Sequence, residues 1–344
     1  MKISRLSPSD VAETQRWNAF VQACPDATFF HRAEWQTIIR DVFRHPTHFL
    51  LAENRGEIEG ILPLAHVKSL LFGNALVALP FAVYGGVATT TPDAAAALEA
   101  AAQDLARQLG VDHLEFRNLS PRHADWPTQD LYVTFRKALL PDVEANMLAI
   151  PRKQRAMVRK GINNGLLSQN DPTSDRFFAL FADNVHRHGT PALPKRYFDT
   201  LLRVFGNDCR ILTVASPDGA PLSSVLSFYF RDEVLPYYAG DDEAARQFAA
   251  NDFKYWELMR QSCEQGLKLF DYGRSKVGTG PYAFKKNWGF EAQPLHYEYC
   301  LYKRDSIPQN NPSNTKYKLF IEAWRRMPIK LANLIGPHIV RNLG

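Results

Sequence analysis

Hydrophobic and polar positions in the first half of the chain follow patterns typical of strands and amphipathic helices. Residues 48–67 form two apolar-rich runs on either side of Asn54-Arg55-Gly56, which predicts a β-hairpin. An alanine-rich stretch then ends at Gly110, a residue type that commonly terminates helices. The other elements expected in this half are strands at 75–86 and 111–119 and helices at about 9–23, 31–43 and 93–109.

The second half repeats this order of elements. A hairpin is predicted at 209–230 around Pro217-Asp218-Gly219. Gly266 and Asp271 stand at the same offset from Gly110 and Glu115, which indicates duplication of a common unit. The other elements expected here are strands at 234–242 and 267–275, a helix at about 243–265, and preceding helices at about 144–164, 175–188 and 195–205.

This repeat predicts an α/β (α+β) architecture with a mostly antiparallel mixed sheet in each half and helices against it. The two halves are expected to join near Leu140-Pro141-Asp142. The domains predicted from these boundaries are 1–141, 142–305 and a basic amphipathic helical tail at 306–344.

Composition places the chain among globular proteins with ample core material. The 344 residues are 45% hydrophobic and 22% charged, with a formal net charge of +5. The long uncharged run 69–92 is broken by glycine and proline, which favours buried strands over a membrane-spanning helix. The four cysteines lie far apart without ligand spacing, so no metal site is expected. The first residues have no apolar signal segment, and a cytoplasmic location is expected.

Two stretches carry enough charge to suggest a binding site. Residues 150–165 predict a helix that concentrates five cations, either as a solvated face or as a surface for phosphate groups. Residues 270–291 combine a strand, a glycine-rich loop and a basic helix, and their charged side chains fall at strand and loop ends, where sites are commonly built. No Ser-His-Asp, GxSxG or HExxH pattern occurs, which favours a transferase that positions two substrates over a hydrolase.

At this level the sequence resembles FemAB-like proteins, which contain two GCN5-related acyltransferase (GNAT) domains in tandem. FDYGRS followed by FKKNWGFE is similar to the closing signature of that family, and IPRKQRAMVRKGINNG resembles its basic helix. The stretches GTPALPKRYF and LPYYAG resemble the branch associated with PEP-CTERM/exosortase and exopolysaccharide gene clusters. The resemblance therefore implies two tandem GNAT-like domains and the transfer of an acyl group to an amine.

The family pattern also implies roles for individual residues. The lysine of the Phe284-Lys285 pair would stabilise the oxyanion that forms during acyl transfer. The residues expected to be catalytic are Lys285, Asp271 and Tyr238. Those expected to bind substrate are Arg274, Lys276, Phe284, Lys286, Arg152, Arg155, Arg159, Arg196 and Tyr197.

Donor and acceptor remain alternatives at this level. Relatives of this kind use acyl-CoA or aminoacyl-tRNA, and no metal is implied. Leu193 stands where precursor-binding relatives have an arginine, four residues before Tyr197. The expected acceptor is an amine-bearing envelope or exopolysaccharide precursor, with tRNA as a partner in the second alternative. A third alternative is a non-catalytic GNAT-like scaffold in an exopolysaccharide complex.

The C-terminal tail, residues 311–344, combines basic side chains with apolar ones at near-helical spacing. Two structures are compatible with this pattern. One is a helix pair that packs back on the body of the protein. The other is an interfacial helix on the cytoplasmic face of the membrane, which would make the protein peripheral to that membrane.

Overall fold

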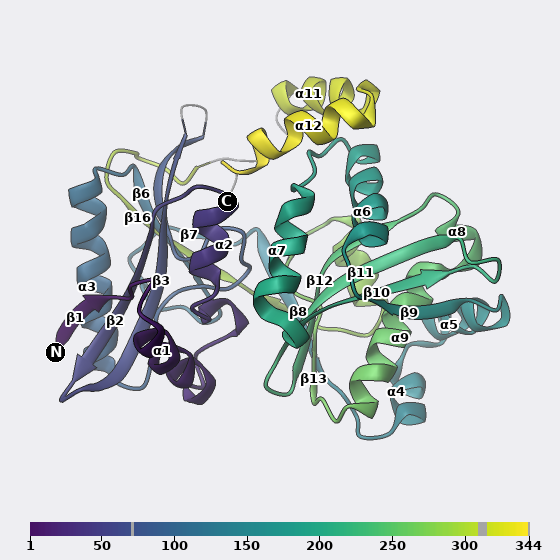
Figure 1. Cartoon of the computed structure of the whole chain (residues 1–344), viewed down its shortest axis with the longest axis horizontal. Helices are drawn as coiled ribbons and strands as arrows, with labels where there is room; N and C mark the ends of the chain where they lie inside the picture. The colour runs from purple at the N-terminus through teal and green to yellow at the C-terminus, as the bar shows by residue number, and fades with distance from the viewer. Residues whose placement is uncertain (70–71, 309–314, 343–344) are drawn as a thin grey trace. The chain divides into compact units, whose positions relative to one another are not determined.

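The computed structural model describes residues 1–69, 72–308 and 315–342, and its chain divides into two compact units (Figure 1). Unit 1 comprises Met1–Leu131, Pro294–Asn310 and Arg341–Gly344. Unit 2 comprises Tyr132–Gln293 and Asn311–Val340. Each unit is built around a mixed sheet with helices against it, so the predicted α/β fold class is confirmed.

Unit 1 holds the predicted hairpin and its alanine-rich helix. Thr91 caps that helix through the Ala94 amide, and Gly110 ends it with a left-handed φ of 60°. The sheet order is β1-β2-β3-β4-β6-β16-β7, with β5 on β3. Its strands are β1 (Lys2–Arg5), β2 (Thr47–Asn54), β3 (Glu57–Ser69), β4 (Gly73–Val77), β5 (Ala88–Thr89), β6 (His113–Asn118), β7 (Thr128–Gln129) and β16 (His296–Leu301). Its helices are α1 (Val11–Ala23), η1 (Phe29–His31), α2 (Trp35–Asp41) and α3 (Pro92–Leu109).

Unit 2 has the sheet order β9-β10-β11-β12-β13-β8-β14, with β15 on β8. Its strands are β8 (Tyr132–Ala138), β9 (Leu167–Asp171), β10 (Cys209–Ala215), β11 (Pro221–Phe230), β12 (Glu233–Asp241), β13 (Leu269–Asp271), β14 (Ser275–Lys276) and β15 (Ala292–Pro294). Its helices are α4 (Val143–Ala149), α5 (Arg152–Asn163), α6 (Asp175–Arg187), α7 (Lys195–Phe205), η2 (Gly206–Asp208), α8 (Ala245–Phe248), α9 (Ala250–Glu264), α10 (Gly280–Asn287), α11 (Thr315–Arg326) and α12 (Ile329–Val340).

The two sheets share one topology. In each, four antiparallel strands lead to a parallel pair, β4 with β6 in unit 1 and β12 with β13 in unit 2. A helix joins the two strands of each parallel pair, α3 in the first case and α9 in the second. This agreement supports the duplication that the sequence indicates.

The sixth strand of each sheet comes from the other half of the chain. β8 follows the elements of unit 1 but pairs with β13, and β16 follows those of unit 2 but pairs with β6. The compact units therefore differ from the consecutive segments 1–141 and 142–305 expected from the sequence. Pairing between strands far apart in the chain leaves no local signal, so boundaries drawn along the sequence cannot show this exchange.

Two helices expected to be continuous are interrupted. The helix expected at 144–164 is divided into α4 and α5 at Pro151, whose ring prevents the preceding residue from continuing a helix. The helix expected at 243–265 is divided into α8 and α9 at Ala249, which has a φ of 58°. In the run 69–92, β4 and β5 confirm the preference for strands, while residues 70–71 lie outside the described part.

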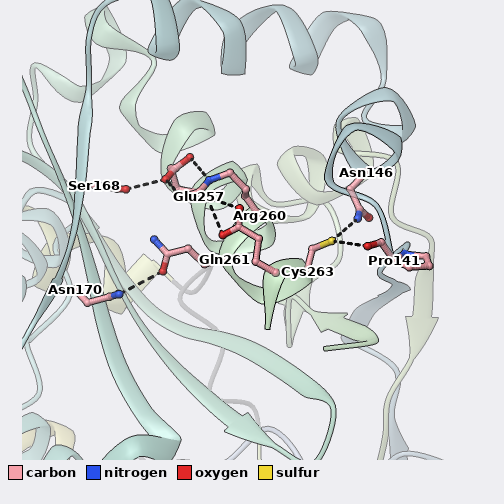
Figure 2. A network of polar contacts seen from close by, with 9 residues as sticks. Pro141, Asn146, Ser168, Asn170, Glu257, Arg260, Gln261 and Cys263 are labelled. Carbon is pink, nitrogen blue, oxygen red and sulfur yellow. Dashed lines mark hydrogen bonds and ion pairs between the residues drawn. The ribbon is translucent and has the colours of Figure 1, made fainter. Parts of the chain in front are cut away.

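Polar contacts connect α9 to elements on both sides of it (Figure 2). Ser168 Oγ on β9 donates to Glu257 Oε2 at 2.8 Å, and Asn170 Nδ2 on β9 donates to Gln261 Oε1 at 3.4 Å. On the other side, Asn146 Nδ2 on α4 contacts Cys263 Sγ at 3.4 Å. These contacts connect α9 with the edge strand β9 and with α4.

The tail helices α11 and α12 dock on unit 2 at the end of α6 (Figure 1). His186 Nε2 lies 2.9 Å from Met327 O, and Arg325 donates to His188 O at 3.4 Å. This agrees with the expected helix pair packed on the body of the protein. Among the described helices, none is both long and apolar enough to span a bilayer.

Candidate functional site

The candidate site begins where the parallel strands β12 and β13 cease to pair. Their ladder comprises Glu233↔Leu269 and Val234↔Phe270. Just beyond, the register of β12 on β11 shifts, so that Tyr237 is an additional residue in a β-bulge. A bulge bends its strand and increases the local twist, which gives β12 a different direction from β13 past this point.

Lys285 of α10 reaches the main chain that follows β13. Its side chain is buried, with 9% of the residue exposed. Nζ donates to the carbonyl oxygens of Tyr272 at 2.7 Å, Gly273 at 3.1 Å and Arg274 at 3.2 Å. An ammonium group has three N–H donors, so these carbonyls accept from all of them. Lys285 therefore fixes the backbone of residues 272–274 and places a buried amine there.

The electrostatic surroundings of Lys285 are mixed. Burial lowers its pKa from 10.5 to about 7, with Asp271 acting to raise it and Arg274 to lower it further. The Nζ atom also lies 5.6 Å from the ring centroid of Phe135 and 5.8 Å from that of Tyr272. The amine can thus change its charge near neutral pH, which ordinary surface lysines do not do.

Asp271, also predicted to be catalytic, is 1% exposed and has several partners. Its carboxylate accepts from Gly273 N at 2.7 Å and Thr134 Oγ1 at 3.3 Å, and it forms an ion pair with Arg136 Nε at 3.2 Å. These contacts hold the turn after β13 in place. Asp271 is thus placed to position the backbone to which Lys285 binds.

Tyr238 and Tyr197 are brought together by the fold. Tyr238 lies on β12 and Tyr197 at the start of α7, and their hydroxyl oxygens are 3.1 Å apart. Burial is the main reason why the pKa of Tyr238 is raised, while Tyr197 and the charge of Arg274 act to lower it. Both hydroxyls therefore stay protonated and can donate hydrogen bonds at neutral pH.

The other residues predicted from the 270–291 stretch, together with Arg196, differ in how far they are buried. The guanidinium carbon of Arg274 lies 4.5 Å from the ring centroid of Tyr132, and Arg274 is exposed. Phe284 packs with Tyr255 and Trp288, at ring-centroid distances of 5.6 and 5.9 Å. Lys276 is half-buried on β14, Lys286 is exposed on α10, and Arg196 is exposed on α7.

The predicted basic residues of α5 form a separate group. They line a surface groove, and one of them, Arg155, donates to Leu148 O at 3.2 Å. The groove is lined by Arg152, Arg155, Ala156, Arg159, Lys160, Asn163 and Asn164. The helix begins next to α10, since a Cβ on Gly289 would lie 3.2 Å from Pro151 Cδ. The N-terminus of this basic helix therefore lies beside the C-terminal end of α10, the helix that carries Lys285.

The same position in unit 1 is covered by main chain. Beyond the parallel pair of β4 and β6, Ala78 N donates to Glu115 O at 2.8 Å. Gly85 and Arg117 exchange two backbone hydrogen bonds of 2.8 and 2.7 Å. The Arg117 guanidinium also donates to Ala82 O at 2.7 Å. These contacts close the equivalent place in unit 1, so the candidate site belongs to unit 2.

Two residues of the site were not identified from sequence. Thr134 and Arg136 come from β8, which the sequence assigns to the first half of the chain, and both contact Asp271. Their stretch has no motif, and only knowledge of the strand exchange would have placed them here. Across the described ranges, no group of three or more His, Cys, Asp or Glu side chains is arranged to hold a metal ion.

Comparisons with known proteins bear on the same part of the chain. Residues 152–286 match the family described as acetyltransferase (GNAT) domain. A curated relative, the UDP-N-acetylmuramoylpentapeptide-lysine N(6)-alanyltransferase of Weissella viridescens, is 24% identical over 136 residues. That alignment covers 39% of this chain and 40% of the relative, so it spans about two fifths of each protein.

Solved structures extend the likeness of the fold to most of the chain. The crystal structure of FemX has a TM-score of 0.68 at 14% identity and covers 88% of this chain and 98% of its own. The C-terminal domain of a putative lysylphosphatidylglycerol synthetase from Agrobacterium fabrum has a TM-score of 0.56 at 14% identity, covering 83% and 91%. A tandem GNAT protein from the clavulanic acid biosynthesis pathway has a TM-score of 0.53 at 14% identity, covering 89% and 99%. The chain therefore has the tandem GNAT-like fold, and residues 152–286 match a GNAT domain by sequence as well.

Proposed function

We propose that this protein is an N-acyltransferase of FemAB type that moves an acyl or aminoacyl group to an amine on a cell-envelope or exopolysaccharide precursor. The observation that carries the proposal is the position of Lys285 at the end of the β12–β13 ladder, inside the segment that matches the GNAT family. In this proposal the protein acts in the cytoplasm, where activated acyl donors are made.

In the proposed reaction, the acceptor amine attacks the acyl carbonyl and the carbonyl oxygen becomes a tetrahedral oxyanion. The longest of the three Lys285 hydrogen bonds, to Arg274 O at 3.2 Å, is the one that an oxyanion would replace. Tyr238 can donate a second hydrogen bond. The intermediate then collapses, the bond to the oxygen or sulfur of the donor breaks, and the proton of the amine passes to the leaving group or to water.

An aminoacyl ester is favoured over acyl-CoA by the acidic residues at the end of β12. A phosphate group at this point would need free amides at a helix N-terminus. Instead, Asp241 forms an ion pair with the fully buried Lys254 at 2.9 Å, and Asp242 accepts from Ala244 N at 2.8 Å. Two carboxylates at this point would oppose the binding of a pyrophosphate. The exposed cations of α5 offer another surface for a polyanionic donor such as tRNA.

The acceptor is proposed from the curated relative and from Leu193, which stands where precursor-binding relatives have an arginine. The name of that relative places its product on a lysine N6 amine of a UDP-N-acetylmuramoylpentapeptide. Leu193 here is buried and apolar, so it cannot bind an anionic precursor as an arginine would. We therefore infer a different amine-bearing precursor. Its exopolysaccharide type follows from the resemblance of the sequence to the PEP-CTERM-associated branch.

The test measures amide formation with a panel of acyl-CoA and aminoacyl-tRNA donors and amino-sugar or peptide acceptors. Product is expected with an aminoacyl-tRNA donor, and treatment with RNase should abolish it. Activity that needs CoA and resists RNase would overturn the donor assignment. Absence of turnover and of any ligand-induced thermal shift across the panel would instead favour the non-catalytic scaffold.

A second experiment examines the basic groove. Arg155→Gln with Arg159→Gln should raise KM for aminoacyl-tRNA, flatten its salt dependence and leave kcat largely unchanged, because phosphate contacts contribute mainly to binding. Arg203→Gln with Arg246→Gln is the matched control, since both of these arginines are exposed on other helices of unit 2. Equal effects in the two double variants would remove α5 from donor binding.

A further inference from the structure

Helix α12 is attached to unit 2 through its smallest residues. Ala332 and Gly336, one turn apart, are the buried residues of this helix. A Cβ on Gly336 would lie 3.3 Å from Ala192 O and 3.4 Å from Pro191 Cβ, so the helix backbone comes close to the loop before α7. The face of α12 that contacts the protein therefore contributes few apolar side-chain atoms to the core.

Three large apolar residues of α12 lie on its exposed side. Leu331, Leu334 and Ile335 are exposed, and Leu334 retains 68% of its accessible surface. These residues follow the i, i+3, i+4 spacing of one helix face. An amphipathic helix on a globular protein normally buries that kind of face. An apolar face turned outward on a docked helix is typical of a surface that binds something else.

Charge indicates which kind of partner this face fits. Lys330 lies among the exposed residues of α12, whereas at the end of α11 Arg325 donates to His188 O and Arg326 forms an ion pair with Glu322 at 2.8 Å. Residues 329–340 contain no Asp or Glu, so no carboxylate of α12 offsets the charge of Lys330. A second copy of the chain, related by two-fold symmetry through this face, would bring the Lys330 side chains of the two copies close together. A surface with negative charge above an apolar interior has no such conflict.

We propose that the outward face of α12 is an interfacial membrane-binding surface for a bilayer that contains anionic lipids. Leu331, Leu334 and Ile335 enter the boundary between headgroups and acyl chains, and Lys330 contacts the anionic headgroups. The inference concerns how the protein is held near a membrane, and it does not depend on which acyl group the protein transfers.

The test uses the full chain in a vesicle co-sedimentation assay with three lipid conditions. These are phosphatidylcholine alone, phosphatidylcholine mixed with phosphatidylglycerol, and the mixed vesicles at high salt. Binding is expected with the mixed vesicles, and it should be weaker without phosphatidylglycerol and in high salt. Leu334→Glu should weaken binding by about tenfold or more, and Lys330→Gln by about fivefold.

The matched control is Leu148→Glu. Leu148 is also an exposed leucine on a helix of unit 2, with 56% of its surface accessible, but it lies on α4. This variant should bind vesicles like the unmodified chain, and circular dichroism should show all variants folded. Equal binding of Leu334→Glu and the unmodified chain, or no binding to any vesicle, would overturn the proposal. Dimer formation abolished by Leu334→Glu without vesicle binding would overturn it in favour of a second copy.

Discussion

At the scale of single residues, Lys285 combines a structural role with a chemical one. Its Nζ atom joins the carbonyl groups of Tyr272, Gly273 and Arg274. The family pattern identified the residue, because Phe284-Lys285 is a recognisable pair in the sequence. Its three backbone partners could not be predicted, since hydrogen bonds to carbonyl groups do not depend on side-chain identity.

Replacing Lys285 should therefore reduce stability as well as activity. Lys285→Met leaves the buried carbonyl groups of Tyr272 and Gly273 and the partly buried one of Arg274 without this donor, and each acceptor that water cannot reach costs about 1–3 kcal/mol. Urea unfolding should show a lower free energy of unfolding, and turnover should be lost. Lys286→Met is the matched control, because this neighbouring lysine is exposed and should change stability by less than about 0.5 kcal/mol. Equal stability of the two variants would contradict the structural role.

The charge of Lys285 gives a prediction for the pH dependence of turnover. Its pKa of about 7 means that the ammonium form is lost as the pH rises through neutrality. If that ammonium stabilises the oxyanion, kcat/KM should contain a limb that falls above a pH of about 7. Lys285→Arg keeps its charge across this range, so a folded variant with residual activity should lack that limb. A falling limb of the same position in both proteins would exclude Lys285 as its source.

His123 of unit 1 gives a prediction for the pH dependence of stability. Burial alone would lower its pKa, but hydrogen bonds to Glu298 and Glu99 raise it to about 9. Because the folded pKa lies above the ordinary value of 6.5, this stabilisation is fully present below pH 6.5 and is lost as the pH rises through about 9. Urea unfolding of His123→Gln should show a large deficit near pH 6 and a smaller one near pH 10. A deficit that does not change with pH would exclude the two carboxylates as its cause.

At the scale of helices and strands, local signals were informative and long-range pairing was not. Local signals predicted the hairpins β2–β3 and β10–β11 and the helix α3, because their turn and cap residues are adjacent in the sequence. The break between α8 and α9 was not predicted. It occurs at Ala249, whose φ of 58° is uncommon for a residue other than glycine. Position in the sheet is decided by contacts between distant segments, and short sequence windows do not contain that information.

The packing of α5 on α9 gives a prediction at this scale. A Cβ on Gly161 of α5 would lie 2.7 Å from Phe253 Cβ, which is too close for two carbon atoms. Gly161→Ala should destabilise the protein, although alanine favours helices by about 1 kcal/mol over glycine. Gly280→Ala on α10 is the control, since nothing lies within 4 Å of the added atom, and it should be neutral or stabilising. Thermal unfolding of both variants decides the matter, and a stabilised Gly161→Ala would contradict the close approach.

At the scale of the whole molecule, the strand exchange connects the two halves of the sequence. β8 supplies Val133 and Phe135 to the core of unit 2, where both are buried. It also supplies Thr134 and Arg136 to the candidate site. The duplicated pattern revealed that there are two similar sheets. It could not reveal which sheet receives each final strand, since either assignment satisfies the same alternation of apolar residues.

Removing β8 should therefore prevent unit 2 from folding even when its own half of the sequence is complete. A fragment of residues 142–344 lacks β8, whereas a fragment of residues 130–344 contains it, and β16 is without its partner in both. Loss of the buried Val133 and Phe135 alone removes about 1.5–3 kcal/mol for each side chain, and the edge of β13 becomes unpaired. The longer fragment should show near-UV circular dichroism and a cooperative urea transition that the shorter one lacks. The same transition in both fragments would mean that β8 is dispensable for unit 2, and the segment 142–305 would then stand as a domain in its own right.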